Sequence, residues 1–79
     1  MSSTERLIQK LVNRTLRKAE LETLLTRLGF HRFRGRGSHE VWGRQDLQDL
    51  HVVIATHSKE VPFYQLKQIE KSLRKRSLI

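Results

Sequence analysis

The stretch Gly35-Arg36-Gly37-Ser38-His39 lies between two short apolar segments of the chain. Two glycines within three residues indicate a tight reversal between strands, because glycine adopts positive φ angles without steric cost. The stretch therefore predicts a β-hairpin, with one strand over residues 30–34 and the next over residues 40–44. His39 would then lie at the point where the second strand begins.

Helical periodicity appears on both sides of this hairpin. Before it, leucines recur at i, i+3, i+4 and i+7 and predict a helix over residues 18–28 that stops at Gly29. After it, the single proline, Pro62, precedes a second periodic segment that predicts a helix over residues 63–75. The residues expected to form the buried stripe of this last helix are Phe63, Leu66, Ile69 and Leu73.

A third strand is predicted over residues 50–55, where Val52, Val53 and Ile54 are adjacent. An apolar run without alternation favours a central strand that is covered along most of its length. The polar residues 45–49 before it are typical of a turn. Together these elements predict an α+β fold, a three-stranded antiparallel sheet with both helices on one face.

The N-terminal segment predicts an additional helix over residues 3–13. Residues 13–15 either interrupt it or belong to one longer helix that continues into the next. Its apolar stripe is Leu7, Ile8, Leu11 and Val12. We expect this stripe to dock on its own domain or on a second copy of the chain, which would form a homodimer through this helix.

Composition limits the classes of function. The 79 residues suffice for one domain, and the net charge of +8 favours a polyanionic partner, nucleic acid or an acidic protein, over a merely soluble surface. The chain has no cysteine, and its four histidines lack the close pairing of a zinc site, so no metal or other cofactor is expected. No apolar run is long enough to span a membrane, and the N-terminus shows no signal core, so a cytoplasmic protein is expected.

His39 is the candidate for chemistry. The hairpin places it near arginines at positions 32, 34, 36 and 44, where an anion could reach it, and histidine is a common general acid or base. The alternative is an ordinary surface histidine. Alternation in the strand puts His39 and Val41 on one face and Glu40 and Trp42 on the other, and Trp42 is interpreted as partly buried rather than as a stacking platform. No cluster of carboxylates indicates Mg²⁺-dependent cleavage, so any nuclease chemistry would be independent of metal and would depend on histidine.

Basic residues also follow one side of the last helix. Lys67 and Lys71 belong to a stripe that Arg74 and Lys75 extend at helical spacing. We interpret this stripe as an electrostatic footprint for a polyanion rather than as a solvated face.

The run from Leu24 to Phe30, followed seven residues later by Gly37-Ser38-His39, resembles the HicA family of toxin messenger-RNA interferases. A third strand that ends in Ile54-Ala55-Thr56-His57 adds to the resemblance, which spans roughly Lys18 to Lys75. The chain is thereby divided into an N-terminal helical extension, residues 1–17, and a HicA-like domain, residues 18–79.

The resemblance implies an α-β-β-β-α fold like that of a double-stranded-RNA-binding domain. It also implies that the protein is the toxin of a toxin–antitoxin system, an endoribonuclease that cleaves messenger RNA and is covered by a HicB-type antitoxin. His39 would be the catalytic residue, supported by Gly37 and Ser38. Many members have a second histidine where this chain has Glu40, and a carboxylate near the site would repel RNA phosphate.

The expected mechanism uses the 2′-OH of RNA as the nucleophile. His39 removes its proton, and His57 or water protonates the leaving oxygen, while Arg34, Arg36 and Arg44 neutralise the charge that develops at phosphorus. The residues expected to contact RNA are Arg32, Arg34, Arg36, Gly37, Ser38, Arg44, Lys59, Lys67 and Lys71. The alternatives are a noncatalytic RNA-binding module of the same fold and an adaptor for an acidic protein.

Overall fold

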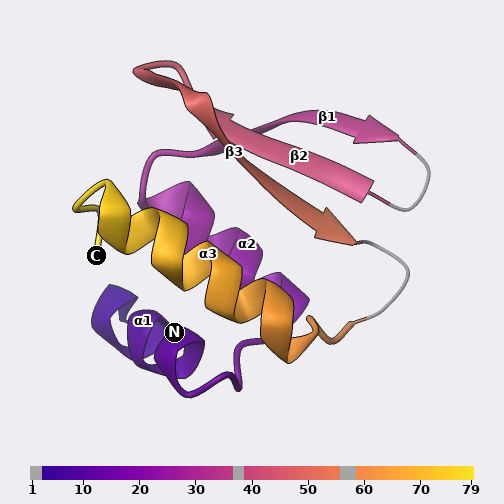
Figure 1. Ribbon diagram of the computed structural model, residues 1–79. Helices are drawn as coiled ribbons and strands as arrows, with labels where there is room; N and C mark the ends of the chain where they lie inside the picture. Colours follow the sequence, from indigo (N-terminus) through magenta and orange to yellow (C-terminus); the bar gives the residue numbers. More distant parts are fainter. Residues whose placement is uncertain (1–2, 37–38, 56–58) are drawn as a thin grey trace.

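The computed structural model describes residues 3–36, 39–55 and 59–79, and within these ranges it contains three helices and three strands. In chain order they are α1 Thr4–Val12, α2 Lys18–Arg27, β1 His31–Arg36, β2 His39–Arg44, β3 Leu47–Ala55 and α3 Phe63–Lys75. The strands form one antiparallel sheet in the order β1-β2-β3. Helices α2 and α3 cover one face of it, and α1 packs beneath them (Figure 1). The predicted α+β class is confirmed, and the arrangement is consistent with a double-stranded-RNA-binding-domain-like fold.

The helices end at residues with left-handed backbone. After α2, Gly29 has φ 91°, and the N–H of Phe30 donates to the carbonyl of Leu25 at 2.9 Å, which confirms Gly29 as the stop. After α1, Arg14 has φ 62°, and the N–H of Thr15 donates to the carbonyl of Lys10 at 2.9 Å. The chain is therefore interrupted between α1 and α2, which answers the question that the sequence left open.

The prediction that the third strand is central was wrong. β2 is the central strand and β3 lies at an edge. In β3, Leu50, Val52 and Ile54 are buried, whereas His51 and Val53 are exposed. Only one face of the sheet is covered by helices, so side chains of the apolar run alternate, and Val53 faces solvent while Val52 is buried.

Two boundaries also differ from the prediction. β3 begins at Leu47, which pairs with Arg44, so the turn contains only residues 45–46 instead of 45–49. β1 extends to Arg36 and β2 begins at His39, so both strands of the hairpin are longer than expected. Paired strands can carry polar residues on an uncovered face, and their ends are therefore poorly marked by hydropathy.

The core lies between the sheet and the two covering helices. Trp42 is buried on the helix side of β2. Three residues of α3 are also buried in this core, Leu66, Ile69 and Leu73. Phe63, predicted to be buried, is 73% exposed. It is the first residue of α3, and Val61, just before the helix, fills the core at this end instead.

The apolar side of α1 is covered in part within the chain, since Ile8 is half-buried and Val12 is 39% exposed. Leu7 and Leu11 are buried in the same core as the residues of α2 and α3. Two ion pairs tie this region to the rest of the protein, Lys10 with Glu20 and Arg14 with Glu70, each with a distance of 2.5 Å between the charged atoms. Of the two docking modes expected for this helix, the structure shows docking on its own chain.

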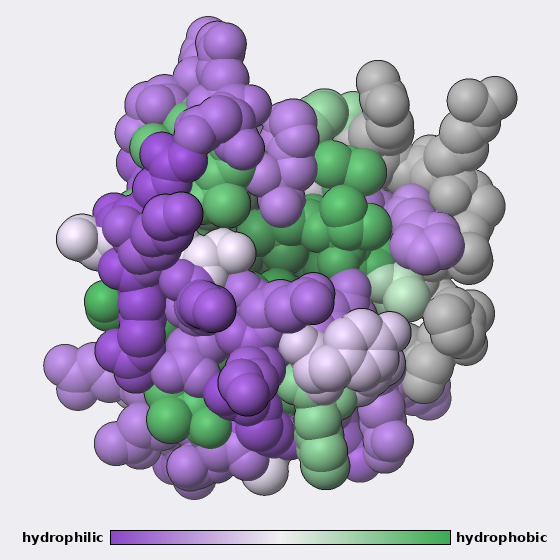
Figure 2. Space-filling model, viewed as in Figure 1, coloured by the Kyte–Doolittle hydropathy of each residue, from purple (hydrophilic) through white to green (hydrophobic). Residues whose placement is uncertain are grey.

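A shallow apolar groove opens between β3 and α3. Figure 2 shows hydrophobic surface exposed between the sheet and this helix, surrounded by hydrophilic side chains. Its volume is about 240 Å³, and Val53 and Ile69 lie in its walls. The amide of Gln65 donates to the carbonyl of Val53 and ties the first turn of α3 to the edge strand. Among the described residues, no helix is both long and apolar enough to cross a bilayer.

Candidate active site

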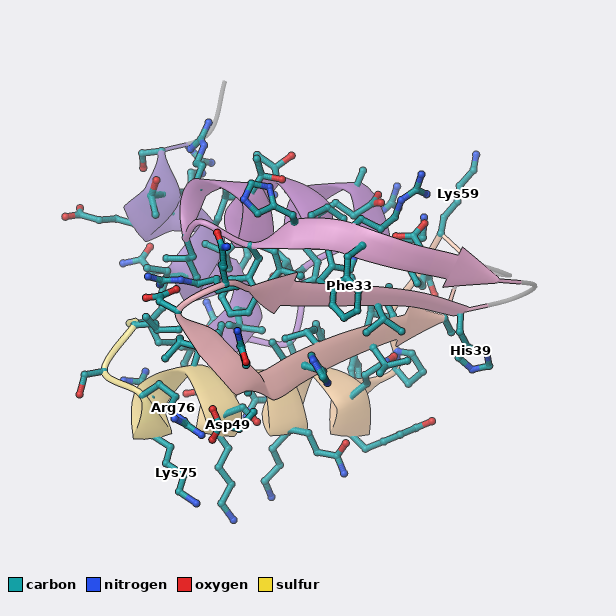
Figure 3. The ribbon with its side chains drawn as sticks, turned by 90° about the horizontal axis from the view of Figure 1, so that it is seen from above. Phe33, His39, Asp49, Lys59, Lys75 and Arg76 are labelled. Carbon is teal, nitrogen blue, oxygen red and sulfur yellow. The ribbon has the colours of Figure 1, made fainter. Side chains whose placement is uncertain are left out.

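His39 is the first residue of the central strand, at one end of the sheet. Its neighbours across the two strand pairs are Arg36 of β1 and Ala55 of β3. The residue is exposed, and Figure 3 shows its side chain projecting beyond the end of the strands. It shares its face with Val41, as alternation predicts, and this is the face that no helix covers. A polymer lying on the sheet could therefore reach the imidazole.

The structure brings only some of the predicted arginines to this end of the sheet. The backbones of Arg34 and Arg36 lie in β1, opposite Val41 and His39. Arg44 is five residues further along β2, about 17 Å from His39 at the rise of an extended strand. Its guanidinium is held by the Leu28 carbonyl at 3.1 Å and by the Asp46 carboxylate at 2.8 Å and 2.9 Å.

Glu40 points to the opposite face from His39 and is 6% exposed. Its carboxylate accepts a hydrogen bond from the Trp42 indole Nε1 at 3.1 Å. Two cations accompany it, Lys18 of α2 with its Nζ at 3.3 Å and Arg32 of β1 with its Nη1 at 3.5 Å. Lys18 Nζ also lies 3.5 Å from Glu22, so Lys18, Glu22, Arg32 and Glu40 form one cluster of charged side chains.

The two carboxyl groups of this cluster have pKa values shifted in opposite directions. Burial alone would raise the pKa of Glu40, but hydrogen bonds with Trp42, Glu22 and Lys18 hold it below its ordinary range. Burial raises the pKa of Glu22, and the adjacent Glu40 raises it further. The ionised form is therefore favoured by these contacts at Glu40 and disfavoured at Glu22.

This geometry removes the repulsion expected from Glu40. Its carboxylate lies beneath the sheet, between β2 and α2, and Lys18 and Arg32 balance its charge. His39 lies on the other face of the sheet. Glu40 thus links the central strand to α2 through Lys18 and does not share a face with His39.

The predicted RNA-contacting lysines are exposed. Figure 3 places Lys59 at the same end of the sheet as His39, with both side chains directed outward. Lys67 and Lys71 lie on exposed positions of α3, and among the described residues no acidic partner is found for any of the three. Arg74, at the end of the same stripe, is paired with Glu70 at 2.8 Å.

Three predicted site residues, Gly37, Ser38 and His57, lie outside the described residues. Within the part of the chain that is described, no group of three His, Asp or Glu side chains could hold a metal ion.

One aromatic contact on the helix-free face was not foreseen from the sequence. The rings of Phe33 in β1 and His51 in β3 lie 5.3 Å apart, on either side of Gly43. A β-bulge between Arg32 and Arg34 places Phe33 out of strict alternation, so periodicity could not assign its face. The glycine near the end of β2, Gly43, was the one available signal, since an aromatic side chain can cover a glycine in a strand.

The structure defines a small α+β domain with an exposed histidine at one end of its antiparallel sheet. The family described as the HicA toxin of bacterial toxin–antitoxin systems matches residues 19–75, and the chain belongs to this family. Neither a curated protein nor a solved structure matches the chain significantly. Helix α1 precedes the matched region.

Proposed function

We propose that this HicA-family toxin is an endoribonuclease that cleaves messenger RNA without a metal ion and uses His39 as its general base. The observation that carries the proposal is the position of His39, which is exposed at the end of the central strand, on the face without helices. The only acidic neighbour in β2, Glu40, is buried on the other face. The approach to the imidazole is thus open to a polyanion.

The chemistry follows from the structure of RNA itself. His39 takes the proton of a ribose 2′-OH, and the 2′-oxygen attacks the adjacent phosphorus. The bond from phosphorus to the 5′-oxygen breaks, and His57 or a water molecule protonates that oxygen. The products are a 2′,3′-cyclic phosphate and a 5′-OH. General acid–base catalysis of this kind typically contributes about 10²–10⁴-fold to the rate.

The charge that develops on the phosphoryl oxygens needs nearby cations. Arg34 and Arg36 belong to the strand beside His39 and are proposed to supply them. Lys59, Lys67 and Lys71 add positive charge along the path of the RNA backbone, together with Arg32 at the β1 edge. Arg44, at the far end of β2, would contact a phosphate away from the cleaved one.

The proposed partner is a HicB-type antitoxin that covers the helix-free face around His39. The protein is proposed to act in the cytoplasm, where messenger RNA is available. Of the stripe on which a homodimer through α1 was expected, Leu7 and Leu11 are covered by the chain itself, and Val12 is the exposed member.

Expression in bacteria tests the proposal. The wild-type chain should arrest growth and fragment messenger RNA, whereas His39→Ala should do neither at equal soluble expression. Co-expression of a HicB-type protein should restore growth. A toxic His39→Ala variant would reject His39 as the base, and RNA protection without fragmentation by the wild type would favour a noncatalytic RNA-binding module.

A further inference from the structure

The helix-free face of the sheet carries a second feature, at the end remote from His39. Phe33 is 55% exposed, and its ring contacts Gly43 and His51. It rests over Gly43, where an added Cβ would lie 2.8 Å from the ring carbon Cε1. The His51 ring stands beside it, tilted by 54°. Figure 3, which looks onto this face, shows Phe33 lying on the sheet surface.

A pocket of about 310 Å³ adjoins the two rings. Its walls combine the rings with polar side chains, Gln45 in the β2–β3 turn, Gln48 near the start of β3 and His31 at the start of β1. An amide side chain can both donate and accept hydrogen bonds. A flat ring surface bordered by such groups suits a planar ligand with donors and acceptors on its edge.

We propose that Phe33 and His51 form a subsite that stacks one unpaired base of single-stranded RNA, a proposal that rests on the RNA-cleaving function above. Aromatic rings bind bases of single strands by stacking, and the strong positive charge of the chain, +8, supplies the attraction for the backbone. The polar edge of the base would reach Gln45 and Gln48.

The position of the subsite connects it to the catalytic residue. Gly43, beneath Phe33, and His39 lie on the same strand and face, about 13 Å apart at the rise of an extended strand. A few nucleotides span this distance. The stacked base would thus hold the strand along β2 and set which phosphate reaches the imidazole.

The glycine supports this assignment. A side chain at position 43 would displace Phe33, and His51 would crowd it as well, since its Cδ2 lies 3.3 Å from the added Cβ. Gly43→Ala is therefore expected to weaken RNA binding by moving the ring, although the substituted side chain never meets the ligand.

Fluorescence anisotropy with a labelled single-stranded oligoribonucleotide tests the proposal. The protein carries His39→Ala so that the RNA stays intact. Adding Phe33→Ala should raise Kd about tenfold or more, the size expected for one base stack, whereas Phe33→Tyr should stay within about twofold. Val12→Ala, which trims an exposed apolar side chain on α1, serves as the control and should leave Kd unchanged. An oligonucleotide lacking the stacked base should bind with equal Kd to the His39→Ala protein and to the same protein with Phe33→Ala added.

Cleavage kinetics separate this proposal from the catalytic one. With the native His39, Phe33→Ala should raise KM about tenfold and leave kcat nearly unchanged. If Phe33→Ala left KM and Kd unchanged while the protein still cleaved RNA, the subsite would be overturned and the endonuclease function would stand. Phe33-dependent RNA binding without any cleavage by the wild type would overturn the endonuclease and keep the subsite. If Phe33→Ala weakened only the binding of a purified antitoxin, the two rings would belong to a protein interface and the RNA subsite would be rejected.

Discussion

Replacing Glu40 by alanine should destabilise the fold strongly, because the cluster beneath the sheet depends on this carboxylate. The buried Trp42 indole N–H would lose its acceptor, which costs about 1–3 kcal/mol. The pairing with Lys18 is partly exposed and partly retained through Glu22, so its loss adds only about 1 kcal/mol. We expect a total of about 2–4 kcal/mol from these two contributions, or a Tm lowered by about 8–32 °C.

Two conservative variants divide this cost. Glu40→Gln keeps an oxygen for the indole and removes only the charge, so it should cost about 1–2 kcal/mol. Glu22→Gln makes the same chemical change in the same cluster, but the pKa of Glu22 is raised by burial. Its ionised form is therefore disfavoured by folding, and its neutral replacement should equal or exceed the wild type in stability at pH 7.

Urea unfolding followed by far-UV circular dichroism measures these differences. Asp46→Asn, on an exposed ion pair, is the control and should lower stability far less than Glu40→Ala. A Glu40→Ala variant within about 0.5 kcal/mol of the wild type, the range of ordinary surface substitutions, would refute the structural role assigned to this residue. Equal losses of unfolding free energy in Glu40→Gln and Glu22→Gln would refute the opposite directions of the two pKa shifts.

Three further outcomes are expected. Acidification below about pH 4, near the ordinary pKa values of Asp and Glu, should reduce the free energy of unfolding, because carboxyls with lowered folded-state pKa values give up their stabilisation as they protonate. A pH series of urea titrations would show this loss. The carboxyls with lowered pKa values are Glu20, Glu40, Asp46, Asp49 and Glu70. Leu11→Ala, in a fully buried position of α1, should cost about 2–5 kcal/mol in the same assay, and an unchanged stability would mean that α1 does not contribute to the core. The double variant Lys67→Ala/Lys71→Ala should flatten the salt dependence of RNA affinity, whereas Arg6→Ala on α1 should not, as titrations at several salt concentrations would reveal.

The order and type of the elements could be predicted from local patterns. The leucine repeat of α2 and its stop at Gly29 each rest on interactions within one or two helical turns, and the sequence shows both. The glycine pair marked the hairpin for the same reason. The position of β3 in the sheet depends on which strands pair, and an apolar run does not reveal that.

The site was predictable in part. Strand alternation correctly separated His39 from Glu40, because β2 is regular at this point. The cations that balance Glu40 come from α2 and β1, and no spacing in the sequence connects Lys18 with Arg32. Phe33 was missed because a bulge breaks the alternation that would have assigned its face.

The end groups of the RNA products test the central claim most directly. A defined single-stranded RNA is incubated with the purified chain, with His39→Ala, and with the wild type in EDTA, and the new ends are analysed. We predict a 2′,3′-cyclic phosphate and a 5′-OH from the wild type, unchanged in EDTA, with the rate of His39→Ala lower by about 10²–10⁴-fold or more. Cleavage that EDTA abolishes, 5′-phosphate ends, or full activity without the His39 imidazole would contradict the account.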